Sequence, residues 1–494
     1  MMPKLVVMLL LLCVAPAVLA ASPMGFDEAR ELLNRTSFAA RVDDINAFAR
    51  LSRAQAVDRL LAGTDKNSVV STPAPAWVNT FESPRRVRLL SEEERKQFQR
   101  EQLQKGVELR SWWMTEMLTT PSPLTEKMVL FWHNHFVSSL QKVRSPVLMY
   151  RQNLLLRKHA FGYFGDLLHE VAKDPAMVVY LDSASNRKGQ PNENFAREVM
   201  ELFTLGEGNY GEQDIKEVAR AFTGWSVDPD RGEFVFRRAQ HDDGVKTVLG
   251  RSGEFDGDAV LDILLAQPQT AELIVTKLWR EFVSPNPDAA EVKRIARMFR
   301  DNRYNIKVAL RALLVSDAFY APQNRAALIK SPVELIVGTL RQFRFETGEM
   351  TPFLFVSRQL GQDLFAPPNV KGWPGGEAWI NSATLLARKQ LLESLFRARE
   401  MRPTPVAMNG ETDNVKAGDN VSGSGKPGID SRQRFARAMM DINFDGDKWL
   451  SQFRPGDPVL KVVLASEPVS APAAGVTGID LVRQMVLDPA YQLK

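Results

Sequence analysis

Apolar residues recur every three to four positions along most of this chain, which is the spacing that places them on one face of an α-helix. Ser91 and Glu94 form a capping-box signature at the start of a helix over about 91–118. Ser122 followed by Pro123 begins a second helix, which carries LTEKMVLFWHNHFVSSL. The same periodicity predicts helices over about 146–159, 164–173, 192–204, 212–223, 258–266, 269–282, 288–300, 305–316, 331–343 and 378–398.

A short β-like segment interrupts this helical pattern at about 233–250. The runs EFVFRR and KTVLG flank a turn at His241-Asp242-Asp243-Gly244, which is typical of a hairpin. The stretch from Pro367 to Gly376 is rich in proline and glycine and is predicted to be a loop. We therefore expect a mainly α protein with one large multi-helix domain and a small β hairpin.

The composition changes after residue 400. The run PTPVAMNGETDNVKAGDNVSGSGKPG has few apolar residues and many Gly, Asn and Asp, so it cannot bury a core of its own. This predicts a flexible linker over 401–433, after a helical domain over 21–400. Residues 434–494 then form a short helical tail that either packs back on the domain or stands alone.

The start of the chain has the composition of a secretory signal peptide at 1–20. Lys4 precedes an apolar run from Leu5 to Val14, and Val18 and Ala20 occupy the −3 and −1 positions of a cleavage site. The alternative is an uncleaved anchor, but the apolar run from Leu5 to Ala20 has only 16 residues, which is short for a membrane span. We expect cleavage after Ala20, export to the periplasm or the medium, and no membrane span in the mature chain.

Charge and cysteine content exclude several classes of protein. The chain has 63 Lys and Arg against 59 Asp and Glu, and this small excess does not indicate a nucleic-acid-binding protein. Its single cysteine, Cys13, lies in the predicted leader. A disulfide framework and a cysteine-based zinc site or nucleophile are therefore excluded from the mature protein.

The segment over 192–204 separates into two faces. Phe195, Val199 and Leu202 form an apolar stripe, and the opposite face is polar, with Asn194, Arg197, Glu198 and Glu201. This face is either a solvated surface or the lining of a site in which Arg197 holds a carboxylate. Glu193, Glu198 and Glu201 offer the hard oxygen ligands that suit Ca²⁺, Mg²⁺ or Mn²⁺.

Two further polar segments accompany this helix. His133 and His135 are two apart on one predicted helix and so point about 200° apart, which prevents both from binding one metal. His241 and Lys246 belong to the predicted hairpin turn, whose alternative is a solvated tip. Our hypothesis brings the three segments together, with catalytic candidates His135, Glu193, Glu198, His241 and Lys246 and metal candidates Glu198, Glu201 and His241.

The tail carries a separate candidate for calcium. Residues 441–447 read DINFDGD, which fits the first half of an EF-hand loop and makes Asp441, Asn443 and Asp445 metal candidates. The twelfth position is Gln452 instead of the usual bidentate Glu, which removes one charge. An acidic turn without metal is the alternative.

Several motifs in a fixed order resemble the bacterial family called domain of unknown function 1800. They are FWHNHF (131–136), NENFARE (192–198), ELFTLGEGNY (201–210), EQDIKEVARAFTGW (212–225), HDDGVKTVLG (241–250), KSPVELIVGTLR (330–341) and PPNVKGWPGGEAWINSATLLAR (367–388). The resemblance covers about residues 24–400 and leaves the linker and tail largely outside. It implies an exported, mainly helical protein without an established activity, and it suggests an exported sulfatase-like protein as a partner.

Two functions remain open from the sequence. One is a metal-assisted enzyme that acts on an envelope or extracellular polymer through the candidate residues above. The other is a non-catalytic binding or assembly partner of another exported protein, in which the same residues form a structural network. An enzyme requires the polar segments to converge at an open cleft, whereas a structural network is internally satisfied.

Overall fold

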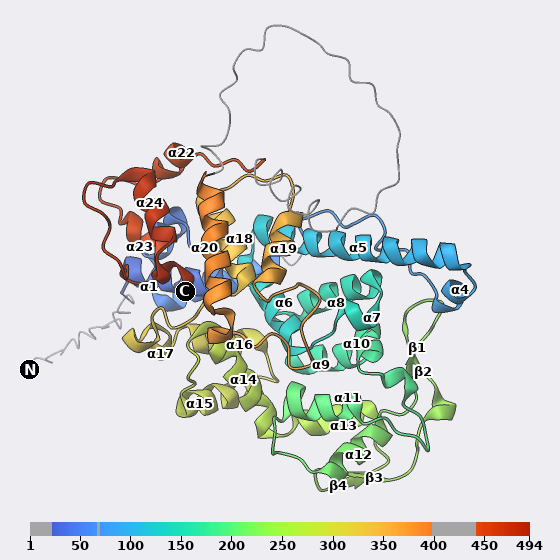
Figure 1. The fold of residues 1–494 in the computed structure, drawn as a ribbon. Coiled ribbons are helices and arrows are strands. Elements are labelled where there is room, and N and C mark those ends of the chain that lie inside the picture. The colour runs from blue at the N-terminus through green and yellow to red at the C-terminus, as the bar shows by residue number, and fades with distance from the viewer. Residues whose placement is uncertain (1–21, 67–69, 398–440) are drawn as a thin grey trace, which may run out of the picture.

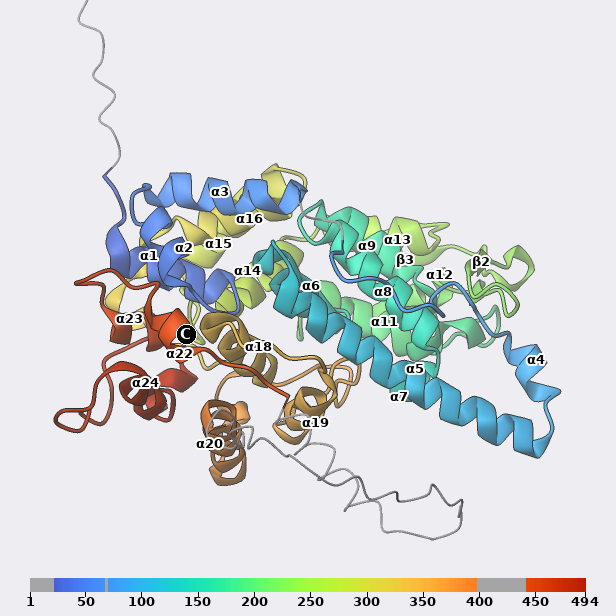
Figure 2. The ribbon, with the colours of Figure 1, turned by 90° about the horizontal axis from the view of Figure 1, so that it is seen from above.

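The computed structural model describes residues 22–66, 70–397 and 441–494, and within them the protein is mainly helical, as the sequence predicts. The first helices and the tail lie together at one end of the molecule, and the small β-strands lie at the opposite end (Figures 1 and 2). The predicted signal peptide at 1–20 and linker at 401–433 lie outside the described residues.

The chain begins with three helices that the sequence analysis does not predict: α1 (Gly25–Thr36), α2 (Val42–Phe48) and α3 (Arg53–Lys66). The short α4 (Pro84–Arg88) then leads into α5 (Glu92–Thr119). The capping box of Ser91 and Glu94 starts α5, as predicted. Every side chain from Glu92 to Lys105 is exposed or half-buried, and the first buried residue of α5 is Gly106. The first half of α5 therefore projects from the body (Figure 2), and α4 beside its start is tied to the body by the ion pair of Arg85 with Asp230 at 3.1 Å. We call residues 84–105 the arm.

The next helices form the centre of the molecule beside the second half of α5: α6 (Pro123–His135), α7 (Leu140–Val143), α8 (Pro146–His159), α9 (Phe164–Ala172) and α10 (Pro175–Tyr180). The predicted continuation of α6 beyond His135 is not formed, because the chain leaves the helix at Phe136. A buried ion pair ties this centre together: Arg157 donates to Glu126 at 2.8 Å, and the indole of Trp113 donates to the same carboxylate at 2.9 Å.

The predicted helix over 192–204 consists of two parts. It begins as α11 (Asn194–Glu198) and widens into a π-helical segment over Val199–Thr204. The wider turn changes the buried face, so that Phe203 is buried while Leu202 is only half-buried. The chain then passes Gly206, whose φ of +82° suits a glycine that ends a helix, into α12 (Glu212–Ala221).

The β structure differs from the predicted single hairpin. Strand β1 (Trp225–Val227) pairs with β2 (Phe234–Phe236), and β3 (Lys246–Val248) pairs with β4 (Arg251–Gly253), both antiparallel. The register places Ser226 opposite Val235 and Thr247 opposite Ser252. EFVF and KTV thus belong to two different hairpins, because each run pairs with a nearer segment in the sequence. The segment that joins the hairpins packs against the end of α12, through hydrogen bonds that only the folded chain provides.

The rest of the body is helical. Six of its helices confirm predicted ones to within a few residues: α13 (Gly257–Leu265), α14 (Pro268–Phe282), α15 (Ala289–Asp301), α16 (Ile306–Leu314), α18 (Pro332–Phe343) and α20 (Ser382–Arg397). Two further helices, α17 (Asp317–Tyr320) and α19 (Thr351–Gln359), are not predicted by the sequence analysis. None of the helices in the described residues combines the length and the apolar composition that crossing a membrane requires.

The described part of the tail packs back on the domain. It holds α22 (Gly446–Leu450), α23 (Val459–Val463) and α24 (Gly478–Val486). Its contact with α18 is polar as well as apolar: the Trp449 indole donates to the carbonyl of Gln342, and the Gln342 amide donates to the carbonyl of Val462, both at 2.7 Å. The tail therefore completes the core of the domain instead of forming a separate unit.

Candidate functional site

The end of α6 holds the glycine-rich loop over 367–376. The amide of Trp373 donates to Oδ1 of Asn134 at 2.7 Å, and Nδ2 of Asn134 donates to the carbonyl of Trp373 at 3.3 Å. Gly372 has φ +83°, and a Cβ there would lie 2.2 Å from Oδ1 of Asn134. The loop requires glycine at this position because its backbone approaches the side chain of Asn134 so closely.

His135, the neighbour of Asn134, is buried beside the π-helical segment. Nζ of Lys277 on α14 donates to Nδ1 of His135 and to the carbonyl of Leu202, both at 2.9 Å. Burial and the charge of Lys277 lower the pKa of His135 well below its ordinary value, so the ring is neutral. Burial, with a smaller contribution from Arg280, lowers the pKa of Lys277 to about 8. Lys277 thus connects His135 to the main chain of the 192–204 segment, which carries Glu193, Glu198 and Glu201 and which we call the acidic helix.

Glu201 of the acidic helix and Glu207, which follows the helix, lie near Lys371 of the 367–376 loop. The Tyr210 hydroxyl donates to Glu201 at 2.8 Å, and Nζ of Lys371 lies 3.9 Å from Glu201 and 3.1 Å from Glu207. Glu198 is half-buried, and burial together with the charge of Glu201 raises its pKa. Lys371 is therefore the cation that lies beside Glu198 and Glu201.

Arg197 and Glu193 belong to a different contact. The guanidinium of Arg197 donates to both carboxylate oxygens of Glu212 at 2.9 Å, and it lies 3.5 Å from Glu193. Arg197 does hold a carboxylate, as the sequence suggests, but the carboxylate is on α12. These ion pairs are partly exposed and join α11 to α12.

The turn that contains His241 and Lys246 is bound to α12. Nδ1 of His241 lies 2.9 Å from the carbonyl of Thr223, and Arg220 donates to Asp242 at 2.9 Å. Nζ of Lys246 donates to the carbonyls of Asp242 and Gly244 at 2.5 and 2.9 Å. Both predicted residues are buried, but their hydrogen bonds close their own turn.

The structure thus brings together two of the three predicted segments, those of His135 and of the acidic helix. It adds two lysines that the prediction missed, Lys277 and Lys371. We call His135, Glu198, Glu201, Lys277 and Lys371 the polar cluster. Lys277 lies in an amphipathic helix next to the apolar positions Ile274 and Leu278. A lysine beside the apolar face was the signal in the sequence that could have indicated its burial. Lys371 lies in the loop motif that the sequence analysis used only to predict a loop.

The predicted metal ligands do not form a common site in the described parts of the chain. Within residues 22–66, 70–397 and 441–494, no three His, Cys, Asp or Glu side chains gather closely enough to hold a metal ion. The hydrogen bonds of His241 and the contacts of Glu198 and Glu201 involve different partners. A Ca²⁺, Mg²⁺ or Mn²⁺ ion at Glu198, Glu201 and His241 stays a prediction without a supporting ligand set.

The DINFDGD segment forms a helix start. Asp445 caps α22 by accepting from the amide of Lys448 at 3.0 Å, and Asn443 forms a backbone bridge with Glu346 at 2.9 Å. Helix α22 begins at Gly446, the sixth position of what would be a twelve-residue calcium loop. The motif's open loop is therefore not formed, and calcium binding by Asp441, Asn443 and Asp445 gains no support from this geometry.

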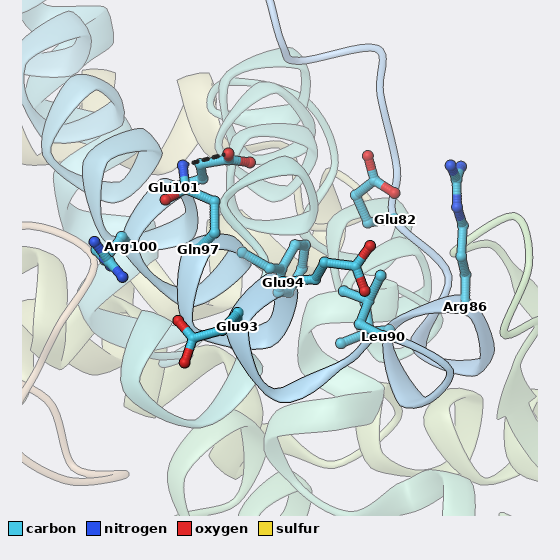
Figure 3. A pocket seen from close by; sticks show the side chains of 10 residues that line it. Glu82, Arg86, Leu90, Glu93, Glu94, Gln97, Arg100 and Glu101 are labelled. Carbon is cyan, nitrogen blue, oxygen red and sulfur yellow. Dashed lines mark hydrogen bonds between the residues drawn. The ribbon is translucent and has the colours of Figure 1, made fainter.

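Two surface depressions lie away from the polar cluster. One has a volume of about 810 Å³ and is bordered by the α1–α2 turn, α3, the 118–124 connection and the end of α18. The other, of about 500 Å³, lies at the tip of the arm, between the 82–90 segment and the first turns of α5 (Figure 3). Glu94 lines this second depression but also accepts from the amide of Ser91 at 2.8 Å, so it serves the start of α5.

The fold and the polar cluster together describe the class of protein. It is a mainly helical protein in which the segments that carry the polar cluster are hydrogen-bonded to one another and to main-chain groups. The chain belongs to the family described as "Protein of unknown function (DUF1800)", whose model matches residues 31–483. No curated protein and no solved structure matches it. The match extends well past residue 400, so the expectation that the resemblance ends at about residue 400 was wrong. The tail belongs to the family domain, in agreement with its packing on α18.

Proposed function

We propose that this protein is an exported, non-catalytic binding or assembly partner of another exported protein, of the sulfatase-like kind that the family resemblance suggests. The observation that carries the proposal is that the polar side chains of the family motifs, and Lys277 beside them, bond to other parts of the same chain. Asn134, Lys277 and Lys371 bond to a loop backbone, a helix carbonyl and neighbouring carboxylates. Such contacts fix the position of segments, which is the work of a structural network.

The arm supports the same proposal because it offers a surface that the body does not cover. Leu89 and Leu103 are 87% and 74% exposed there, the two largest exposed fractions among the large apolar residues of the described chain. The capping box and the three glutamates of the first turn stabilise α5 at its start, and the ion pair of Arg85 with Asp230 fixes α4, so the arm is preformed. A preformed helix loses little conformational entropy when it binds a partner.

The test is co-expression with an exported sulfatase-like protein from the same bacterium, followed by affinity purification and light scattering. We expect a complex of defined stoichiometry with the wild-type chain. The double variant Leu89→Ser/Leu103→Ser should weaken it. Leu386→Ser, which removes a 58% exposed leucine from α20, is the matched control and should not. A wild-type chain that stays monomeric beside a folded partner would refute the proposal.

A metal-assisted enzyme acting on an envelope or extracellular polymer is the second candidate, and one observation favours it. Glu198 is half-buried, its pKa is raised by burial and by Glu201, and Lys371 and Tyr210 lie around the same carboxylates. Carboxyl groups with raised pKa values are typical of general acids. Glu198→Gln should abolish hydrolysis of the polymer or metal uptake under this hypothesis, and it should leave partner binding unchanged under the first.

A further inference from the structure

The 810 Å³ groove has a basic rim. Four arginines line it, against two carboxylates. One of these carboxylates, Asp44, is already paired with Arg41 at 2.8 Å, and the other, Glu346, is exposed and accepts from the Asn443 amide at 3.3 Å. The groove therefore carries more positive than negative charge. The four residues are Arg41, Arg59, Arg341 and Arg344.

The four arginines are incompletely neutralised. Arg59 is exposed and lies over the ring of Phe48 at 4.9 Å, and among the described residues it has no ion-pair partner. Arg344 reaches Asp43 only at 3.6 Å. Arg341 donates to the carbonyls of Met117, Leu118 and Thr120 and not to a carboxylate.

The surroundings of Arg341 disfavour its positive charge. Burial and the neighbouring Arg41 lower its pKa to about 10. An anion in the groove would reduce the repulsion between these two guanidinium groups, because each would gain a charge of opposite sign.

The floor of the same groove is apolar. Leu60, Leu118 and Pro123 line it and are only half-buried, so part of each side chain is open to the groove. Leu33, Phe48, Leu124, Leu340 and Phe345 also contribute, and these five belong to the buried core of the domain. A volume of about 810 Å³ lies in the range of sites for small ligands, which combine an apolar lining with a few polar groups that fix orientation.

We propose that this groove binds an amphiphilic anion, a single carboxylate or phosphate group carried on an apolar chain, with the anionic group at Arg41, Arg59 and Arg344 and the chain on the apolar floor. Arginine suits both groups because its planar fork offers paired N–H donors to carboxylate and phosphate oxygens. Arg341 positions the rim from beneath, since its own donors are engaged by main-chain carbonyls. The proposal does not depend on the proposed assembly function.

The experiment is titration calorimetry of the full mature chain with laurate and with dodecyl phosphate, both below their micellar concentrations. We expect saturable binding of one molecule of either probe, weakened by salt. Arg59→Gln/Arg344→Gln should weaken it by about tenfold for each arginine removed. Arg86→Gln/Arg88→Gln on the arm removes the same charge elsewhere and should leave it unchanged.

Three results would overturn the proposal. Equal binding of the neutral dodecyl maltoside would show that the apolar floor acts alone. Equal binding of inorganic phosphate would show that the floor has no role. Unchanged laurate affinity in Arg59→Gln/Arg344→Gln, with an unaltered melting curve, would place the ligand elsewhere. Association with the sulfatase-like partner, measured on the same variant, should be retained, so that failure of this site is distinguishable from failure of the assembly function.

Discussion

Glu334 lies at the centre of a buried charge cluster whose disruption should strongly destabilise the protein. Its carboxylate bonds to the ammonium groups of Lys127 and Lys494, and Glu281 lies 3.4 Å from each lysine. Burial alone would raise the pKa of Glu334, but the two lysines hold it well below its usual range. Glu334→Gln keeps the shape of the side chain and removes its charge, which leaves two buried ammonium groups beside a single, partly exposed carboxylate.

The size of the effect follows from this geometry. Breaking a buried ion pair by removing one partner costs about 3–5 kcal/mol, because an uncompensated charge stays in the interior. Glu281 remains near both lysines, and the glutamine can still accept from the amide of Ser331, now at 2.8 Å from the carboxylate. We therefore expect a loss near the lower end, about 3 kcal/mol in the free energy of unfolding.

Urea denaturation at pH 7 measures this loss, and hydrogen exchange locates it. Exchange should increase first where residues 328–330 pair with 492–494, as in the bond from the Lys330 amide to the carbonyl of Gln492 at 2.8 Å. Glu393→Gln is the control, since Glu393 pairs with Arg397 on the surface of α20 and should cost at most about 0.5 kcal/mol.

A loss below about 1 kcal/mol for Glu334→Gln would refute the reasoning, because it would mean that the two lysines are neutral or hydrated in the folded chain. A second variant makes the test independent of that single substitution. Lys127→Met added to Glu334→Gln removes one of the stranded ammonium groups and should recover part of the lost stability. Further destabilisation by this addition would also contradict the electrostatic account.

Three further predictions concern other parts of the chain. Burial raises the pKa of Asp174 from 3.8 to about 7. The folded state therefore binds the proton more tightly than the unfolded state, and stability should fall as pH rises from about 4 to about 7. In Asp174→Asn, the melting temperature should fall less over this pH range. An unchanged pH dependence of the melting temperature would exclude Asp174 as its source. Asn134→Ala removes both bonds to Trp373 and should cost about 1–3 kcal/mol, with faster exchange of the Trp373 amide; protection equal to wild type would show that the loop holds itself. N-terminal sequencing of the protein purified from its native compartment should begin at Ala21, and recovery of Met1 on membrane-bound protein would contradict the expected export.

The helices were the most predictable part of the fold because their signals are local. A helix start depends on a cap and a few following residues, as at Ser91 for α5 and at Ser331 for α18, where the capping boxes are formed. Positions such as these are decided within one or two turns of chain. The family motifs are also local, since each is a run of adjacent residues, and they identify the family without the fold.

Residue periodicity could not predict the π-helical segment. The apolar stripe of Phe195, Val199 and Leu202 assumes 3.6 residues per turn, and the wider turn over Val199–Thr204 buries Phe203 in place of Leu202.

The predicted strand pairing was wrong because the local pattern did not identify the partner strands. EFVF and KTV suit a hairpin with each other, but β1 and β4 are nearer partners whose own strand signals are only three residues long.

The sequence by itself determined the helical class, the approximate bounds of most of the helices that it predicted, and the set of polar residues from which a site could form. Only the tertiary structure decided which of these residues meet. His135 and Glu201 are joined to α14 and to the 367–376 loop through Lys277 and Lys371, each more than 70 residues away from its partner along the chain. His241 and Lys246, which are much nearer to the acidic helix in sequence, close their own turn instead. The physical reason is that a side chain's partner depends on how distant helices pack, and local sequence carries no record of that packing.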